Sequence, residues 1–174
     1  SYPFITKFNG EIFMIPETRE ARCIEIYKCK QFPLEWELVE RRFEGEQIVD
    51  TTIFEKKGKY YIFLNKLSPY RKTCNEELFI YSSDNLLNEW KPNPLNPVVI
   101  DISKSRSAGH IFKKDGKWIR PSQDCSKAYG SRTVFSEIIV SENYFSDKVI
   151  GYIYPEWEKS NLGSVSKINL DISK

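Results

Sequence analysis

The sequence lacks the patterns that mark several large classes of protein. It contains a single histidine, His110, and its four cysteines show no C-x-x-C spacing, so a zinc site of the usual Cys/His type is not expected. No apolar run approaches the roughly 20 residues of a membrane span, and no signal-peptide core is present. We therefore expect a soluble cytoplasmic protein with reduced structural thiols, no metal and no cofactor.

Clustered positive charge is also missing. Charged residues of both signs make up 29% of the chain, which has a formal net charge of +2. The lysine pairs at 56–57 and 113–114 are isolated, and each lies at the tip of a predicted hairpin. Nothing resembles a basic groove, so we expect no nucleic-acid partner.

Helical periodicity of useful length is absent, and a repeat of strands takes its place. Three ten-residue blocks align without a gap: SYPFITKFNG, VDTTIFEKKG and SAGHIFKKDG, ending at Gly10, Gly58 and Gly116. Asn-Gly and Asp-Gly are strong hairpin signals because these residues tolerate positive φ, and Lys57-Gly58 is a weaker one. Each block therefore predicts a strand that runs into a turn.

Two further predicted strands follow each block. The second strands are EIFMIPE, KYYIFLN and KWIRPSQ, and the third are CIEIYKC, ELFIYSS and RTVFSEI. In the first two repeats, the similar tripeptides LEW and NEW follow the third predicted strand and end at Trp36 and Trp90. Four short strands in repeats of roughly 50 to 60 residues indicate an all-β protein, a β-propeller of four-stranded antiparallel blades. A β-sandwich is the alternative.

The repeats divide one domain into blades at about 1–48, 49–105 and 106–155. Residues 156–174, with the strand-like SVSKINLDI, are the start of a further blade or a tail. Since propellers close with about 4 to 8 blades, we expect an incomplete ring. Either flanking blades are missing or the chain self-associates through its open blade edges.

Inner strands of successive blades line the channel of a propeller, so equivalent positions converge there. The second position of the aligned block is Tyr2, Asp50 and Ala108, and only Asp50 is a carboxylate. The seventh position after each glycine is always polar, and these side chains form either a polar ring or solvated strand ends: Glu17, Asn65 and Gln123.

Arg120 stands four residues after its glycine, where the other repeats carry Met14 and Ile62. It is paired with a carboxylate, for which Asp124 and Glu137 are candidates, or it offers its guanidinium to a ligand. His110 either lines the channel or is a hydrogen-bonded structural residue. Tyr129 is a candidate for stacking on a sugar face or for the core.

The words SYPF, IPE, IVDTTIF, RSAGHIF, RPSQDCS and YG resemble a known family. It is the five-bladed propeller module at the N-terminal side of plant glucosamine inositolphosphorylceramide transferases and in bacterial formyltransferase-linked proteins. That module is similar in fold to glycoside hydrolases of the arabinanase, xylosidase and invertase type. The resemblance covers most of residues 1–155, and RPSQD is its most specific part.

The resemblance implies a carbohydrate-facing channel in which carboxylates on successive blades could act on a glycosidic bond. Asp50 matches the aspartate at the start of a blade, and Glu17 or Glu137 is a candidate second carboxylate. Tyr2, however, stands where the first blade of a hydrolase usually brings an aspartate.

Three functions remain open. The favoured one is recognition of a glycan or glycolipid headgroup within surface-glycan or glycolipid synthesis, by Arg106, His110, Arg120, Gln123, Asp124 and Tyr129. The second is a glycosidase or glycosyl-transferring enzyme that uses Asp50 with Glu17 or Glu137. The third is a structural propeller with a protein-binding face. Tyr2 and the missing blades favour recognition over catalysis.

Overall fold

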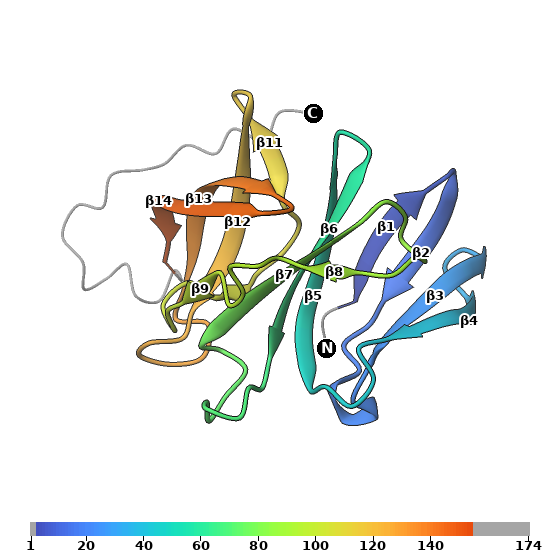
Figure 1. Cartoon of the computed structure of the whole chain (residues 1–174), viewed down its shortest axis with the longest axis horizontal. Helices are drawn as coiled ribbons and strands as arrows, with labels where there is room; N and C mark the ends of the chain where they lie inside the picture. Colours follow the sequence, from blue (N-terminus) through green and yellow to red (C-terminus); the bar gives the residue numbers. More distant parts are fainter. Residues whose placement is uncertain (1–2, 155–174) are drawn as a thin grey trace.

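A computed structural model describes residues 3–154, which form three antiparallel sheets in chain order (Figure 1). The first sheet contains β1 (Phe4–Phe8), β2 (Glu11–Ile15), β3 (Ile24–Gln31) and β4 (Glu35–Arg42). The second contains β5 (Ile48–Lys56), β6 (Lys59–Lys66), β7 (Glu77–Ser83) and β8 (Lys91–Pro92), with β9 (Val99–Ile100) beside β7. The third contains β10 (Arg106–Ser107), β11 (Phe112–Lys114), β12 (Lys117–Asp124), β13 (Arg132–Ser141) and β14 (Tyr144–Ile153).

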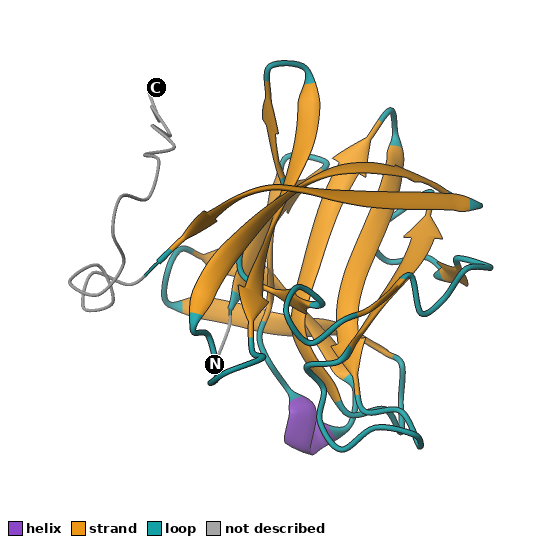
Figure 2. Ribbon diagram, turned by 90° about the vertical axis from the view of Figure 1, so that its left-hand side faces the viewer, coloured by secondary structure: helices purple, strands orange, loops and turns teal. Residues whose placement is uncertain are grey.

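Strands dominate the described residues, in which the only helix is the short 3₁₀ segment η1 (Arg19–Ala21) (Figure 2). The predicted all-β propeller architecture is confirmed, and three blades cover only part of a ring. No helix among these residues is long and apolar enough to cross a membrane. Tyr2 and residues 156–174 lie outside the described residues.

The three aligned glycines all occupy tips of hairpins, which point upward in Figure 1. Gly10, Gly58 and Gly116 have φ of 79°, 74° and 77°. The residues before them also have positive φ: Asn9 (48°), Lys57 (54°) and Asp115 (49°). Two successive positive φ values define the type I′ turn that suits the twist of a hairpin. The predicted repeat is therefore confirmed, including its weakest member, Lys57-Gly58.

The third hairpin departs from the prediction, because the expected strand at 109–112 is interrupted. Two short strands, β10 and β11, pair with β12 in place of one continuous strand, and residues 108–111 lie between them. Pro121 of β12 stands at the gap, and a proline has no N–H to donate to a ladder. Its carbonyl still accepts a bond from the Ala108 nitrogen, at 3.2 Å. Gly109 follows with φ of 141°, a conformation that favours glycine.

Two hydrophobic cores hold the sheets together. The first lies between the first and second sheets and includes Phe4, Phe13, Ile53, Leu64 and Trp90. The second lies between the second and third sheets and includes Phe54, Phe63, Ile80, Ile111 and Ile138. Neighbouring residues of a strand point to opposite faces, so β5, the first strand of the second sheet, sends Ile53 to one core and Phe54 to the other. The second sheet is therefore covered on both faces.

Candidate functional site

Asp50 is placed by a bulge at the start of β5. The pairing of β5 with β6 shifts register between Val49 and Thr52, and Asp50 itself has a φ of 50°. Left-handed backbone is uncommon for residues other than glycine, and bulges often re-aim side chains at functional sites. The Asp50 side chain is 3% exposed, so it needs a polar partner.

Arg106 of β10 supplies that partner. Its Nε lies 2.5 Å from Asp50 Oδ2, and its Nη1 donates to Asn75 Oδ1 at 2.6 Å. Burial alone lowers the pKa of the Arg106 guanidinium, but the hydrogen bond and the charge of Asp50 outweigh burial and raise it. Gln123 Nε2 donates to Ser107 O at 2.9 Å and lies 3.4 Å from Asp50 Oδ2. The inner strands of two blades thus share one polar cluster.

Tyr129 covers this cluster from the loop between β12 and β13. Its ring centroid lies 4.8 Å from Arg106 Cζ, a cation–π distance. The side chain is 66% exposed, so much of the ring remains open to solvent. Four of the predicted site residues therefore come together: Asp50, Arg106, Gln123 and Tyr129. We call them, with Asn75, the channel cluster.

Glu17 lies in the same neighbourhood without a direct contact to the channel cluster in the described structure. Burial raises the pKa of the Cys74 thiol, and weaker electrostatic contributions come from Arg19, Arg106, Glu17 and Asp50. Glu17 therefore lies close enough to Cys74 to act on the pKa of its thiol, as Arg106 and Asp50 of the channel cluster do.

The amide of Asn65 is structural. Its Nδ2 donates to Glu77 O at 2.8 Å and to Ser105 O at 3.0 Å, and its Oδ1 accepts from Ser107 N at 3.1 Å. The side chain is fully buried. The seventh position after the glycine is therefore no solvated strand end in the second repeat, and Asn65 joins the second blade to β10.

Arg120 is paired, and its partner is neither of the two predicted carboxylates. Its Nη2 lies 2.6 Å from Asp147 Oδ2 and donates to Lys104 O at 2.8 Å. The side chain is 1% exposed. This geometry corrects the predicted pairing with Asp124 or Glu137 and leaves Arg120 away from the channel cluster. The sequence analysis did not identify Asp147, because the aligned sequence segments contain no counterpart of β14.

Asp124 and Glu137, two further predicted site carboxylates, pair with cations outside the channel cluster. Gln123 and Asp124 are neighbours on β12, so they point to opposite sides. Burial raises the pKa of Asp124, but hydrogen bonds from Ser126 and Arg132 outweigh it and lower the pKa. Glu137 pairs with Lys117 at 2.9 Å, on the face of the third sheet turned away from the second core.

His110 joins two blades through its ring. It is exposed, and its centroid lies 4.3 Å from that of Phe4 in β1. His110 thus reaches from the interrupted inner strand of the third blade to the inner strand of the first blade.

The sequence analysis did not identify Asn75, because this residue belongs to the β6–β7 loop and the repeat offers no equivalent of that loop. Among residues 3–154, no group of three His, Cys, Asp or Glu side chains could hold a metal ion.

Solved structures share the architecture. A GH43 β-1,3-galactosidase superposes with a TM-score of 0.67 and 15% identity, over 84% of this chain and 44% of that chain. An exo-β-1,3-galactanase from Clostridium thermocellum has a TM-score of 0.63 and 12% identity, over 84% and 33%. At such identities the likeness shows the fold alone.

Proteins with related sequences identify the family, which the solved structures do not. Glucosamine inositolphosphorylceramide transferase 1 of Arabidopsis thaliana is 34% identical over 148 residues, which is 83% of this chain and 19% of the relative. The protein of the same name from Oryza sativa subsp. japonica is 30% identical over 148 residues, 83% and 20%. The chain spans about a fifth of the length of these relatives. The family model of the N-terminal region of glucosamine inositolphosphorylceramide transferase 1 matches residues 1–163, and the chain belongs to this family.

Proposed function

We propose that this domain recognises a glycan or glycolipid headgroup at the channel cluster and does not cleave a glycosidic bond. The observation that carries the proposal is the Asp50–Arg106 ion pair. Asp50 Oδ2 is held by Arg106, whereas a catalytic base must reach water or a sugar. Glycosidases also need a second carboxyl group about 5 to 9.5 Å away. Glu137 and Asp124 are bound to other cations, so neither supports this role.

The same geometry suits recognition. Arg106 Nη2 has no partner among the described residues, and a guanidinium N–H is a good donor to phosphate or to a sugar hydroxyl. The exposed ring of Tyr129 offers an apolar face against which a sugar can stack. The relatives are named for glucosamine and inositolphosphorylceramide, which supply a sugar and a phosphate-bearing headgroup. These names support the proposed ligand class.

Calorimetry with two separate probes, glucosamine and myo-inositol 1-phosphate, tests the proposal. We expect binding of at least one probe, weakened up to about tenfold by Tyr129→Ala because one stacking contact is lost. Lys127→Ala is the matched control, since Lys127 is exposed on the same loop. Binding that Tyr129→Ala leaves unchanged would contradict the assigned position of the site.

A second assay separates recognition from catalysis. Incubation with aryl glycosides should release no sugar. Release that Asp50→Asn abolishes, while circular dichroism shows that the variant remains folded, would instead establish the glycosidase alternative, with Glu17 as the remaining candidate acid. Absence of both turnover and probe binding would favour the structural alternative.

A further inference from the structure

A cavity of about 570 Å³ opens between the first and second sheets, at one end of the first core. The turn before β3 contributes Arg22, the β4–β5 connection Glu46, the end of β6 Lys66, and the β6–β7 loop Tyr70. Phe79 of β7, which belongs to the first core, also lines it. The volume lies within the range of about 300 to 1,000 Å³ that is typical of small-ligand sites. No residue of the channel cluster lines this cavity, so it is a separate site, which we call the Tyr70 cavity.

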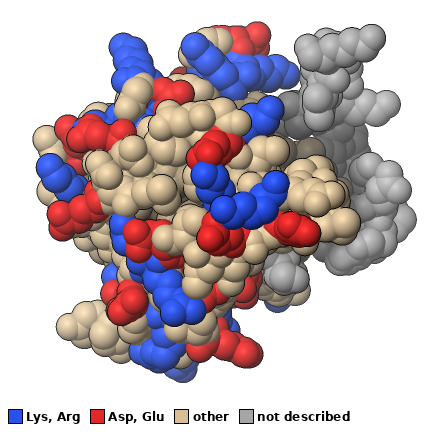
Figure 3. Space-filling model, turned by 90° about the vertical axis from the view of Figure 1, so that its right-hand side faces the viewer, with Lys and Arg blue, Asp and Glu red and all other residues tan. Residues whose placement is uncertain are grey.

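The charged groups of the Tyr70 cavity compensate one another. Its lining contains two cations, Arg22 and Lys66, and two carboxylates, Glu46 and Glu77. Lys66 Nζ lies 3.1 Å from Glu46 Oε1, and Arg71 Nε lies 2.8 Å from Glu77 Oε1. Positive and negative side chains are likewise interspersed on the outward side of the first sheet (Figure 3). A charged ligand would meet a group of its own sign in the wall, whereas hydroxyl groups can donate to the carboxylates and accept from the cations.

Lys66 keeps its charge and its position in the wall. Burial alone lowers the pKa of the Lys66 ammonium group, but hydrogen bonds and the charge of Glu46 outweigh burial and raise it. The ammonium nitrogen also lies 4.8 Å from the centroid of the Phe79 ring, a cation–π distance. An ammonium group has three N–H donors, so Lys66 can donate to a ligand as well as to Glu46.

Tyr70 gives the cavity an open aromatic rim. Its side chain is 89% exposed, whereas that of Phe79 inside the cavity is 8% exposed. A tyrosine ring combines an apolar face with a polar edge, and the C–H groups of a sugar ring can pack against such a face. The cavity therefore combines an aromatic surface with polar groups of balanced charge.

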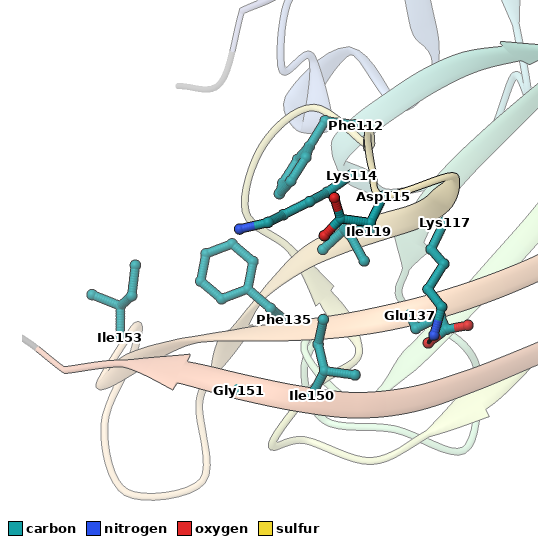
Figure 4. A pocket seen from close by; sticks show the side chains of 10 residues that line it. All are labelled: Phe112, Lys114, Asp115, Lys117, Ile119, Phe135, Glu137, Ile150, Gly151 and Ile153. Carbon is teal, nitrogen blue, oxygen red and sulfur yellow. Dashed lines mark hydrogen bonds and ion pairs between the residues drawn. The ribbon is translucent and has the colours of Figure 1, made fainter. Parts of the chain in front are cut away.

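The groove on the outer face of the third sheet shows the contrast (Figure 4). It has a volume of about 210 Å³, and its apolar lining comes from Phe112, Ile119, Phe135, Ile150 and Ile153. Hydroxyl groups placed against these side chains would lose hydrogen bonds to water without gaining others. This groove therefore does not suit a sugar, whereas the Tyr70 cavity does.

We propose that the Tyr70 cavity binds a neutral sugar ring, which stacks on Tyr70 and forms hydrogen bonds with Lys66 and Glu46. Lys66 donates to a hydroxyl oxygen, and Glu46 accepts from a hydroxyl group. Glu77 contributes less, because it is 6% exposed and is held by Arg71. The site is separate from the channel cluster, and it does not depend on the function proposed for that cluster.

An NMR titration of the full chain tests both the ligand class and the position. The probes are the methyl β-glycosides of glucose, galactose and mannose, with inorganic phosphate as the anionic probe. We expect at least one glycoside to bind with a Kd on the order of 1 mM and to shift the amide signals of Glu46, Lys66 and Tyr70. Shifts at Arg106 and Gln123 alone would place the sugar at the channel cluster and would overturn the proposal. No shift with any glycoside, or tighter binding of phosphate in the cavity, would overturn it as well.

Substitution of Tyr70 gives an independent readout. Tyr70→Ala should raise the Kd of the bound glycoside up to about tenfold, because the stacking contact is lost. Tyr70→Phe keeps the ring and should retain most of the affinity. Tyr144→Ala is the matched control, since Tyr144 is 51% exposed on β14 of the third sheet and should leave the Kd unchanged. Equal affinities of the Tyr70→Ala and Tyr144→Ala variants would show that the Tyr70 ring does not contact the sugar and would contradict the proposed site.

Discussion

Asp50 and Arg106 lie on inner strands of two different blades, and their ion pair joins the strands with Nε 2.5 Å from Oδ2. The Arg106 side chain is 12% exposed and that of Asp50 is 3% exposed. Removal of either partner therefore leaves a largely buried charge without compensation. The pair is important for stability whatever ligand the cluster binds.

The first prediction measures this coupling. Arg106→Met and Asp50→Asn should each lower the free energy of unfolding by about 3 to 5 kcal/mol at pH 7. The double variant should lose less than the sum, with a coupling of about 1 to 3 kcal/mol. Urea denaturation of the four proteins provides the values. As a control, Lys30→Met breaks the Lys30–Glu37 ion pair, in which both side chains are about half exposed, and should change stability far less than Arg106→Met or Asp50→Asn. Strict additivity would show that the two charges do not interact.

The second prediction concerns acid stability at Asp147. Burial raises the pKa of this carboxyl group, but the charge of Arg120 and its hydrogen bond outweigh burial and lower it. The stabilisation is therefore complete above the unfolded-state pKa of about 3.9 and is lost as pH falls through the lower folded-state pKa. Asp147→Asn should lower the unfolding free energy by about 3 to 5 kcal/mol at pH 7 and flatten its fall below about pH 4.

Urea titrations at pH 7, 5 and 3 test this acid dependence. Asp115→Asn makes the same chemical change at an exposed hairpin tip and should keep the dependence of the unmodified chain. An unchanged slope in Asp147→Asn would mean that other carboxyl groups set the acid limit.

The sequence predicts the hairpins well because turn chemistry is local. Asn9-Gly10 and Asp115-Gly116 favour positive φ by themselves, and the gapless repeat extends the prediction to Lys57-Gly58. The break in the third inner strand was not predicted, although its cause, Pro121, is visible in the sequence. The effect of Pro121 depends on which residues of the neighbouring strand it pairs with, and the short sequence pattern of a strand does not specify that register.

Two residues of the channel cluster were predicted from positions that the repeats share, whereas Asn75 and Asp147, which share none, were missed. Asp50 and Gln123 follow from aligned positions, and the structure brings them within 3.4 Å. Asn75 and Asp147 reach their partners from a loop and from an outer strand, so their contacts depend on tertiary packing. Arg120 was correctly identified as unusual for its position, but burial beside an unforeseen carboxylate explains it.

A third prediction uses the weakest hairpin. Lys57 has a φ of 54°, a conformation that asparagine tolerates better than lysine. Lys57→Asn should therefore raise the unfolding free energy by about 0.5 kcal/mol, and Gly58→Ala should lower it by about 1 kcal/mol. Thermal and urea unfolding measure both. Lys113→Asn, on the strand β11, lacks the positive φ and should give no gain.

The last prediction concerns the contact of Asn65 with β10. Asn65→Asp keeps the shape of the side chain and the acceptor for Ser107 N, but it replaces the donor to the carbonyl oxygens of Glu77 and Ser105. An ionised carboxyl group there faces two oxygens in a buried site, so its folded-state pKa is expected above the unfolded value. The variant should therefore lose about 2 to 4 kcal/mol at pH 7. It should recover part of this loss near pH 4, where the protonated group can donate one bond.

Urea unfolding of Asn65→Asp at pH 7 and pH 4 checks both the loss and the direction of recovery. Asn88→Asp is the matched control, because Asn88 is exposed and the same charge there should change stability by about 0.5 kcal/mol or less. A loss that stays constant between the two pH values would indicate that packing at Asn65, and not its donor, joins the second blade to the third.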